Sequence, residues 1–282
     1  MRKKQNRAVI FKNLPEIGLM TVLGRNITNM FPIHIHQSLT VGLITKGTAL
    51  LSTYRGTVVV SQGNLFIVNP GEPHSIQPRA QESYDYLIFC FSKRLIKNIY
   101  TPIRDENCRT LDIPYIQQHL IENQPLFNQF IYFYKIFGCK LPQNNATPLL
   151  KSIFKELITD RADVSPNPNP WIKNTGIKNV QLLIDQNPSS NLSLRELAQI
   201  AHLSPYYFLK SFKKEIGISP YHYQLQMRIK NAQNHLLTGH TIAETAQETG
   251  FVDQSHFTRF FQKITGITPG EYLKFNLPES TR

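Results

Sequence analysis

The 282-residue sequence predicts an α+β protein of two domains, a β-rich domain followed by an all-helical one. Residues 8–92 alternate short β-branched runs with turn residues, a pattern typical of a sandwich or small barrel. Beyond Gly176, apolar residues recur at helical spacing. Asp163–Gly176 carries three prolines among serine and asparagine, which excludes a helix interior and indicates a linker. We therefore expect domains at 1–162 and 177–276, joined by a linker at 163–176.

Glycine-containing pairs mark the ends of the predicted strands at Lys46-Gly47, Arg55-Gly56, Gln62-Gly63 and Pro70-Gly71. A further strand is expected at 83–92, and from Ile113 the apolar period becomes helical. The residues at that spacing are Ile116, Leu120, Ile121, Leu126, Phe130, Ile131, Phe133, Tyr134, Phe137, Leu149, Leu150, Ile153, Phe154, Leu157 and Ile158. We expect two or more helices that pack on the β-rich domain, with an aromatic face that also serves as a dimer seam.

Helix starts are clear in the second domain. Ser193 is a candidate N-cap, and Ser204-Pro205 and Ser219-Pro220 place a proline at the first helical position after a capping serine. The helix after Ser219 is long and ends at Gly239. Helix-turn-helix motifs are expected at about 193–214 and 241–263.

Composition narrows the class of protein. The net charge of +12 favours polyanionic partners, although residues from Trp171 onward carry 12 basic and 8 acidic side chains, a net of only +4. Bulk charge therefore does not locate a nucleic-acid surface. Apolar runs are too short for a membrane span or a signal peptide, so we expect a cytoplasmic protein. The scattered cysteines, read as reduced thiols, are Cys90, Cys108 and Cys139.

The helical domain contains an internal repeat. Residues 208–223 and 257–272 share seven identities in sixteen positions, where unrelated segments share about one. Upstream, "LAQIAHLS" matches "TAQETGFVD" with Val252 inserted. Each copy reads as helix, tight turn, helix.

The second helix of each copy presents residue types that read DNA. The candidate DNA-binding residues are Tyr206, Leu209, Lys210, Lys213, Gln254, Ser255, Thr258 and Arg259. A plain solvated face is the competing interpretation, and the tandem repeat weighs against it.

Residues 178–275 resemble the DNA-binding domain of the AraC/XylS family of bacterial transcription regulators. The matching positions are Ala243, Ala246, Gly250, Phe251, Gln254, Ser255, His256, Phe257, Arg259, Phe260, Phe261, Gln262, Lys263, Gly266, Thr268, Pro269 and Tyr272, with Arg228, Ala232, Leu236 and Leu237 in the connecting helix. The resemblance implies a sequence-specific regulator, an activator among the possibilities, with two recognition helices about one DNA turn apart, a homodimer, and contact with RNA polymerase if it activates. Leu209 is apolar where polar readers are frequent, so we expect the second motif and Lys210 to carry more of the specificity.

"FPIHIH" and "GNLFIVNPGEPHSI" resemble the two cupin motifs, so the first domain is expected to be a cupin-like barrel that binds a small polar or aromatic effector. The candidate contacts are His34, His36, Tyr54, Arg55, Glu72 and His74. Enzymatic cupins also carry a carboxylate after the histidine pair, and "QSLTVG" supplies none, so we expect no metal and no cofactor.

Two other classes of function remain as alternatives. The first is a metal-dependent cupin enzyme fused to a DNA-binding module. The second is a DNA-repair fusion, which requires a reactive cysteine constellation that the sequence lacks. The regulator is the preferred interpretation, and we expect no enzymatic activity.

Overall fold

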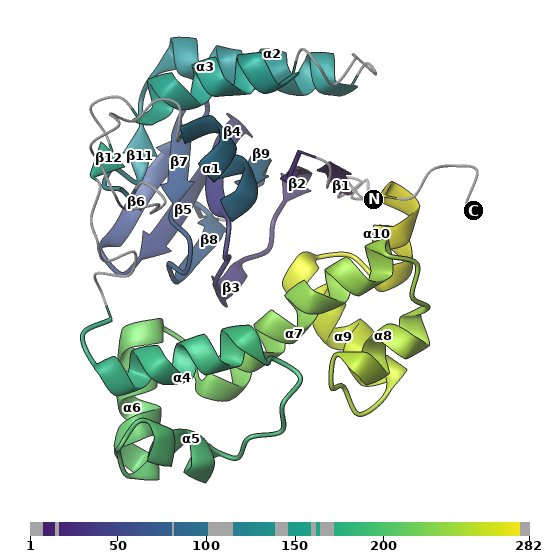
Figure 1. Ribbon diagram of the computed structural model, residues 1–282. Coiled ribbons are helices and arrows are strands. Elements are labelled where there is room, and N and C mark those ends of the chain that lie inside the picture. Colours follow the sequence, from purple (N-terminus) through teal and green to yellow (C-terminus); the bar gives the residue numbers. More distant parts are fainter. Residues whose placement is uncertain are drawn as a thin grey trace. The chain divides into compact units, whose positions relative to one another are not determined.

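The computed structural model describes residues 8–14, 17–80, 82–100, 115–138, 146–158, 162–163 and 172–276. The chain divides into two compact units, one built mostly from residues before the proline-rich segment and one mostly from residues after it. Figure 1 shows strands together with helices in the first, whereas helices dominate the second. The predicted α+β class is confirmed. The predicted domain bounds remain a prediction, because most of the linker lies outside the described residues.

Antiparallel strands form most of the first unit, although residues 31–35 and 73–75 are grouped with the second. A six-stranded sheet has the order β1-β2-β9-β4-β7-β11, a four-stranded sheet has the order β3-β8-β5-β6, and β10 pairs with β12. The strands are β1 (Ala8–Leu14), β2 (Leu19–Ile27), β3 (Phe31–His34), β4 (Leu39–Lys46), β5 (Thr48–Thr53), β6 (Gly56–Ser61), β7 (Leu65–Val68), β8 (His74–Pro78), β9 (Tyr84–Phe91), β10 (Tyr115–Ile116), β11 (Leu120–Ile121) and β12 (Ala162–Asp163).

The centre of the larger sheet is buried on both faces. β4 pairs with β7 and β9, and its first six residues are buried. Gly42 faces Phe66 on β7, and a Cβ there would lie 2.0 Å from that ring. Only glycine leaves the Phe66 ring room to fill the core at this point.

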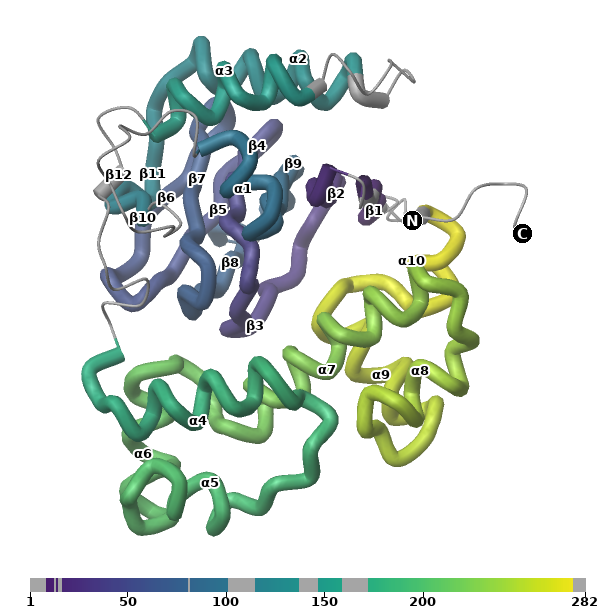
Figure 2. Tube along the Cα trace, in the orientation of Figure 1, coloured from purple at the N-terminus to yellow at the C-terminus, as the bar shows by residue number. Residues whose placement is uncertain are grey.

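Three helices complete this unit. They are α1 (Lys93–Tyr100), α2 (Gln124–Gly138) and α3 (Ala146–Ile158). Figure 2 shows α2 and α3 running side by side. Phe130 and Phe133 of α2 and Phe154 of α3 are buried against Phe89 and Phe91 of β9.

The predicted helical start near Ile113 is wrong for three residues. Ile116 lies in β10, and Leu120 and Ile121 form β11, which pairs with β7. A short apolar run satisfies either period, and here pairing with a strand about 55 residues earlier in the chain decides the outcome.

Helices form most of the second unit. They are α4 (Thr175–Gln186), α5 (Leu194–Ile200), α6 (Pro205–Ile216), α7 (Pro220–Leu237), α8 (Ile242–Glu248), α9 (Gln254–Thr265) and α10 (Pro269–Asn276). Ser193, Ser204 and Ser219 are the N-caps of α5, α6 and α7, which confirms these predictions. Among the described helices, none is long and apolar enough to cross a membrane.

Candidate nucleic-acid interface

Each repeat forms a helix-turn-helix, and the two are built alike. α5 opens with a capping box in which Ser193 N–H donates to Glu196 Oε2 at 2.7 Å. α8 opens with the same device, Thr241 N–H donating to Glu244 Oε2 at 2.8 Å. Reciprocal caps satisfy backbone donors at the start of each short helix, which would otherwise be marginal.

The turns between the helices use a left-handed residue at the same aligned position. In the second motif it is Gly250, with φ of 80°. In the first it is His202, with φ of 55°. A left-handed residue lets the chain reverse within a few residues before α6 or α9 begins.

The second helix of each motif is anchored by aromatic rings. Phe212 lies against Tyr223 at 5.8 Å between centroids, and Phe261 against Tyr272 at 5.5 Å, with interplanar angles of 74° and 71°. Phe208 and Phe257, one turn earlier, are also fully buried. The repeated sequence therefore fixes α6 and α9 against their cores in the same rotational setting.

That setting turns the predicted reading residues outward. On α6 and α9, seven are exposed and one, Thr258, is half-buried. Arg259 lies with its guanidinium 5.8 Å from the Phe260 ring, a contact that limits its freedom without removing it from solvent. The exposed residues are Tyr206, Leu209, Lys210, Lys213, Gln254, Ser255 and Arg259.

The connecting helix α7 joins the two motifs through Arg228. Its side chain is buried, and burial lowers the pKa of the guanidinium. Nε donates to Pro188 O at 2.9 Å, Nη2 donates to Ser190 O at 3.0 Å, and Nη1 donates to Gly250 O. Arg228 thus ties the loop before α5 to the turn before α9.

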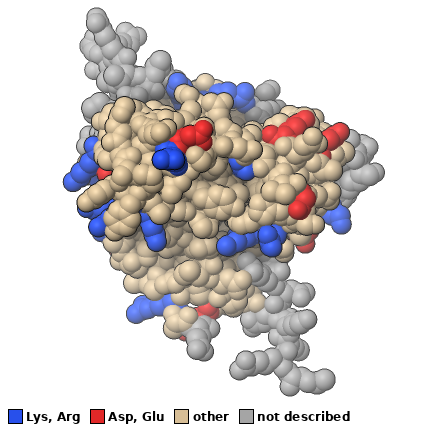
Figure 3. All heavy atoms as spheres, turned by 90° about the horizontal axis from the view of Figure 1, so that it is seen from below, with Lys and Arg blue, Asp and Glu red and all other residues tan. Residues whose placement is uncertain are grey.

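On the face shown in Figure 3, lysine and arginine side chains are scattered among uncharged residues rather than gathered into one patch. The predicted DNA contacts therefore depend on the residue types of α6 and α9 rather than on bulk charge.

Two exposed residues beside these helices were not among the predicted DNA-binding residues. Val252, the residue inserted in the second motif, is 88% exposed directly before the N-cap of α9. Tyr207 of α6 is 61% exposed and packs edge-on against Tyr206. The insertion of Val252 could have predicted this exposed position, because an apolar residue without a counterpart in the first motif has no place in the repeated core.

The predicted effector residues fall into two groups. The rings of His34 and His74 lie 4.2 Å apart, whereas His36 belongs to the other compact unit. The histidines brought together in space are therefore those of the two cupin-like motifs.

Tyr54, Arg55 and Glu72 belong to the second group. Arg55 Nε donates to Tyr54 OH at 2.7 Å, and the Tyr54 and Tyr115 hydroxyls are 2.7 Å apart. Glu72 is fully buried, with Oε1 2.8 Å from His119 Nε2.

The partners Tyr115 and His119 were missed, because they are 61 and 47 residues from Tyr54 and Glu72 along the chain. Since the Glu72 carboxylate is engaged inside the fold, its predicted contact with an effector remains a prediction.

Comparison with known proteins agrees with both units. Residues 17–157 match the model of the AraC-like ligand binding domain, and residues 197–274 match that of a helix-turn-helix domain. The HTH-type transcriptional regulator YbfI of Bacillus subtilis is 26% identical over 89% of this chain and 90% of its own. The arabinose operon regulatory protein of Escherichia coli is 27% identical over 80% of each chain.

Among solved structures, the unsaturated fatty acid-bound form of ToxT from Vibrio cholerae superposes with a TM-score of 0.58 at 13% identity, covering 98% of each chain. This likeness concerns the fold, and it extends over both units. The matched ligand-binding model alone spans half of the 282 residues. The chain therefore belongs to the AraC/XylS family of transcription regulators, with a DNA-binding helix-turn-helix region that follows an AraC-like ligand-binding domain.

Proposed function

We propose that α6 and α9 read two adjacent major-groove segments of one operator, with α7 as the spacer between them. The observation that carries this proposal is the matched burial of the two aromatic anchors, which leaves the reading residues of both helices exposed. Arginine pairs with guanine, glutamine with adenine, and apolar side chains with the thymine methyl. Arg259 and Gln254 of α9 therefore read base edges, while Lys210 is the principal polar reader of α6.

The test compares Arg259→Ala with Lys93→Ala, which removes an equal charge from an exposed position on α1. Operators are first selected from a random DNA library with the full chain. Arg259→Ala should weaken binding by about 1–3 kcal/mol and relax the preference at one base position. Lys93→Ala should leave both unchanged. Equal base preferences for Arg259→Ala and the parent protein would remove Arg259 from the reading surface.

A small molecule bound by the AraC-like ligand-binding domain modulates this binding. The support is the match of residues 17–157 to that domain, the contact between the His34 and His74 rings, and the hydrogen bond from Arg55 to Tyr54. The ToxT structure holds an unsaturated fatty acid. Isothermal titration of the full chain with fatty acids, sugars and aromatic metabolites tests this. Absence of heat from the whole panel would count against it.

The protein acts as a homodimer in the bacterial cytoplasm and, as an activator, contacts RNA polymerase. Support for the dimer comes from α2, where Tyr132 remains 60% exposed although its neighbours Phe130 and Phe133 are buried in the core. Sedimentation at micromolar concentration tests it, with Tyr132→Ala expected to shift the protein toward monomer.

Regulation without catalysis is preferred to the enzyme alternatives. A repair function would need a reactive thiol, whereas Cys90 is buried and burial raises its pKa to about 11. Cys108 and Cys139 lie outside the described residues. Stoichiometric iron or manganese, lost together with His34 and His74, would instead favour a cupin enzyme.

A further inference from the structure

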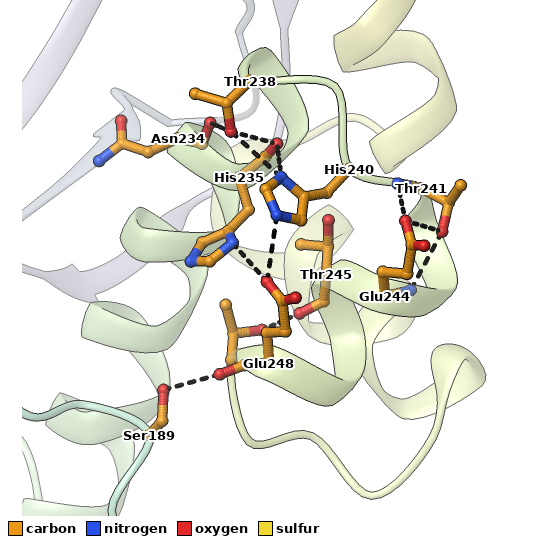
Figure 4. A network of polar contacts seen from close by, with 10 residues as sticks. Ser189, Asn234, His235, Thr238, His240, Thr241, Glu244, Thr245 and Glu248 are labelled. Carbon is orange, nitrogen blue, oxygen red and sulfur yellow. Dashed lines mark hydrogen bonds and ion pairs between the residues drawn. The ribbon is translucent and has the colours of Figure 1, made fainter.

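Three potential metal ligands of the helical unit meet where α7 gives way to α8 (Figure 4). His235 belongs to the last turn of α7, His240 lies in the turn that follows, and Glu248 is the last residue of α8. One ligand atom from each lies within 4.8 Å of the other two. We propose that His235, His240 and Glu248 form a binding site for Zn²⁺ or a similar borderline divalent cation, which joins the connecting helix to the second helix-turn-helix motif.

The spacing of the ligand atoms suits a tetrahedral ion. Nδ1 of His235 is 2.8 Å from Oε2 of Glu248, and Nε2 of His240 is 3.4 Å from the same oxygen. Bonds of about 2.0–2.2 Å in a tetrahedron place neighbouring ligand atoms about 3.3–3.6 Å apart. Small side-chain adjustments therefore suffice to coordinate an ion.

The hydrogen bonds of His240 leave the correct nitrogen for a metal. Its Nδ1 lies 3.1 Å from the backbone oxygen of His235, a contact that the ring makes as a donor. In the neutral ring the proton is then on Nδ1, and the lone pair of Nε2 points toward Glu248. Metal-binding histidines commonly donate their second N–H to a backbone carbonyl in this way, which fixes both the tautomer and the ring orientation.

His235 offers the complementary atom. Its Nδ1 is shielded from solvent and forms no hydrogen bond of good geometry within the described part of the chain, although Glu248 Oε2 is close. The three side chains are 26%, 36% and 45% exposed, in the order His235, His240, Glu248. Because all three side chains are partly exposed, a small movement of the Glu248 carboxylate opens the site to an incoming ion, and water can complete the fourth position.

Electrostatics and the internal repeat both favour this assignment. Glu248 places a carboxylate at the carboxyl end of α8, where the helix dipole disfavours negative charge and a cation is stabilising. At the aligned position the first motif has Ile200, which is partly exposed and has no carboxylate. The helix-turn-helix fold thus does not require an acidic residue there, and the cluster is particular to the second motif.

No metal was expected from the sequence, and this group was not predicted. His235 and His240 are five apart, with Glu248 eight further on, so no single helix face carries them. Only the reversal of the chain between α7 and α8 brings them together.

The test titrates Zn²⁺ into the untagged full chain carrying His34→Gln and His74→Gln, because these two neighbouring histidines offer a competing pair of zinc ligands. Competition with a chromophoric chelator gives stoichiometry and affinity. We expect one equivalent of zinc, with affinity reduced about 100-fold or more by Glu248→Gln or His240→Gln, since loss of even an outer-shell partner costs 10–100-fold. His222→Gln, an exposed histidine at the start of α7, is the matched control and should change nothing.

Hydrogen exchange on the protein with all histidines intact supplies an independent readout. Zinc should slow exchange of amides between 235 and 248, and this protection should vanish in Glu248→Gln. Equal zinc affinity in the parent and in both ligand variants would overturn the proposal. So would zinc binding that leaves exchange in 235–248 unchanged. Because neither readout involves DNA, the result stands apart from the outcome of the operator experiments.

Discussion

Replacing the turn residue of the second motif tests how the repeat forms its two turns. Gly250 has φ of 80°, and a Cβ there would lie 3.0 Å from Ser189 O and 3.2 Å from Arg228 Cζ. A left-handed conformation costs a non-glycine residue about 1–2 kcal/mol. Crowding by the new Cβ weakens the hydrogen bond from Arg228 to Gly250 O, which costs about 1 kcal/mol. Alanine also lowers the conformational entropy of the unfolded chain, which offsets about 0.4–1 kcal/mol of this loss. Gly250→Ala should therefore destabilise the second motif by about 2 kcal/mol.

The first motif supplies the opposite change. His202 already has φ of 55° at the aligned position and is exposed, so His202→Gly relieves backbone strain and loses little packing. The added glycine loses more conformational entropy on folding, which costs about 0.5–1 kcal/mol. The free energy of unfolding should therefore rise by roughly 0.5 kcal/mol in total.

Native-state hydrogen exchange of the full chain resolves the two motifs separately. Gly250→Ala should raise the opening equilibrium constant of α8 and α9 amides about 30-fold, because 1.4 kcal/mol is a factor of ten. His202→Gly should lower that of α5 and α6 about twofold. Changes of the same sign at both positions, or a loss below 0.5 kcal/mol for Gly250→Ala, would refute this account of the turns.

Two further predictions concern the cap of α8 and the phosphate contacts of α6. The pKa of Glu244 is lowered, chiefly by the hydrogen bond from the Thr241 backbone N–H. The contribution of Glu244 to helix stability is therefore complete above the ordinary carboxyl pKa and disappears as the pH falls through the depressed folded value. Hydrogen exchange of α8 amides between pH 6 and 3 should show this loss of stability, and Glu244→Gln should abolish its dependence on pH. Lys213 is exposed on α6 and should contact a phosphate. Lys213→Ala should therefore weaken binding equally for all operators and reduce the slope of log affinity against log salt concentration by about one. A change in preference confined to one base position would contradict that role.

The parts of the fold that could be predicted depend on local chemistry. Ser204 and Ser219 start helices because a capping hydroxyl precedes a proline at the first helical position. The backbone N–H that each hydroxyl caps lies three residues further along the chain. The reading faces of α6 and α9 followed from the buried phenylalanines, because four-residue spacing fixes one helix face and therefore the opposite one.

The parts that could not be predicted depend on distant partners. Leu120 and Ile121 fit a helical period, yet they pair with β7. The Glu72 carboxylate lies 2.8 Å from His119, which is 47 residues away in sequence. His235 and Glu248 meet only through a reversal of the chain. In each case the deciding interaction lies outside the window in which periodicity or spacing is visible.

The most direct test of the central claim is a hydroxyl-radical footprint of the full chain on a selected operator. Two reading helices in successive major grooves should protect two segments about 10 bp apart on one face of the duplex. Inserting 5 bp between the segments should turn one to the opposite face and abolish simultaneous protection. A single protected segment, or a footprint and affinity unchanged by the insertion, would contradict the claim that α6 and α9 read DNA together.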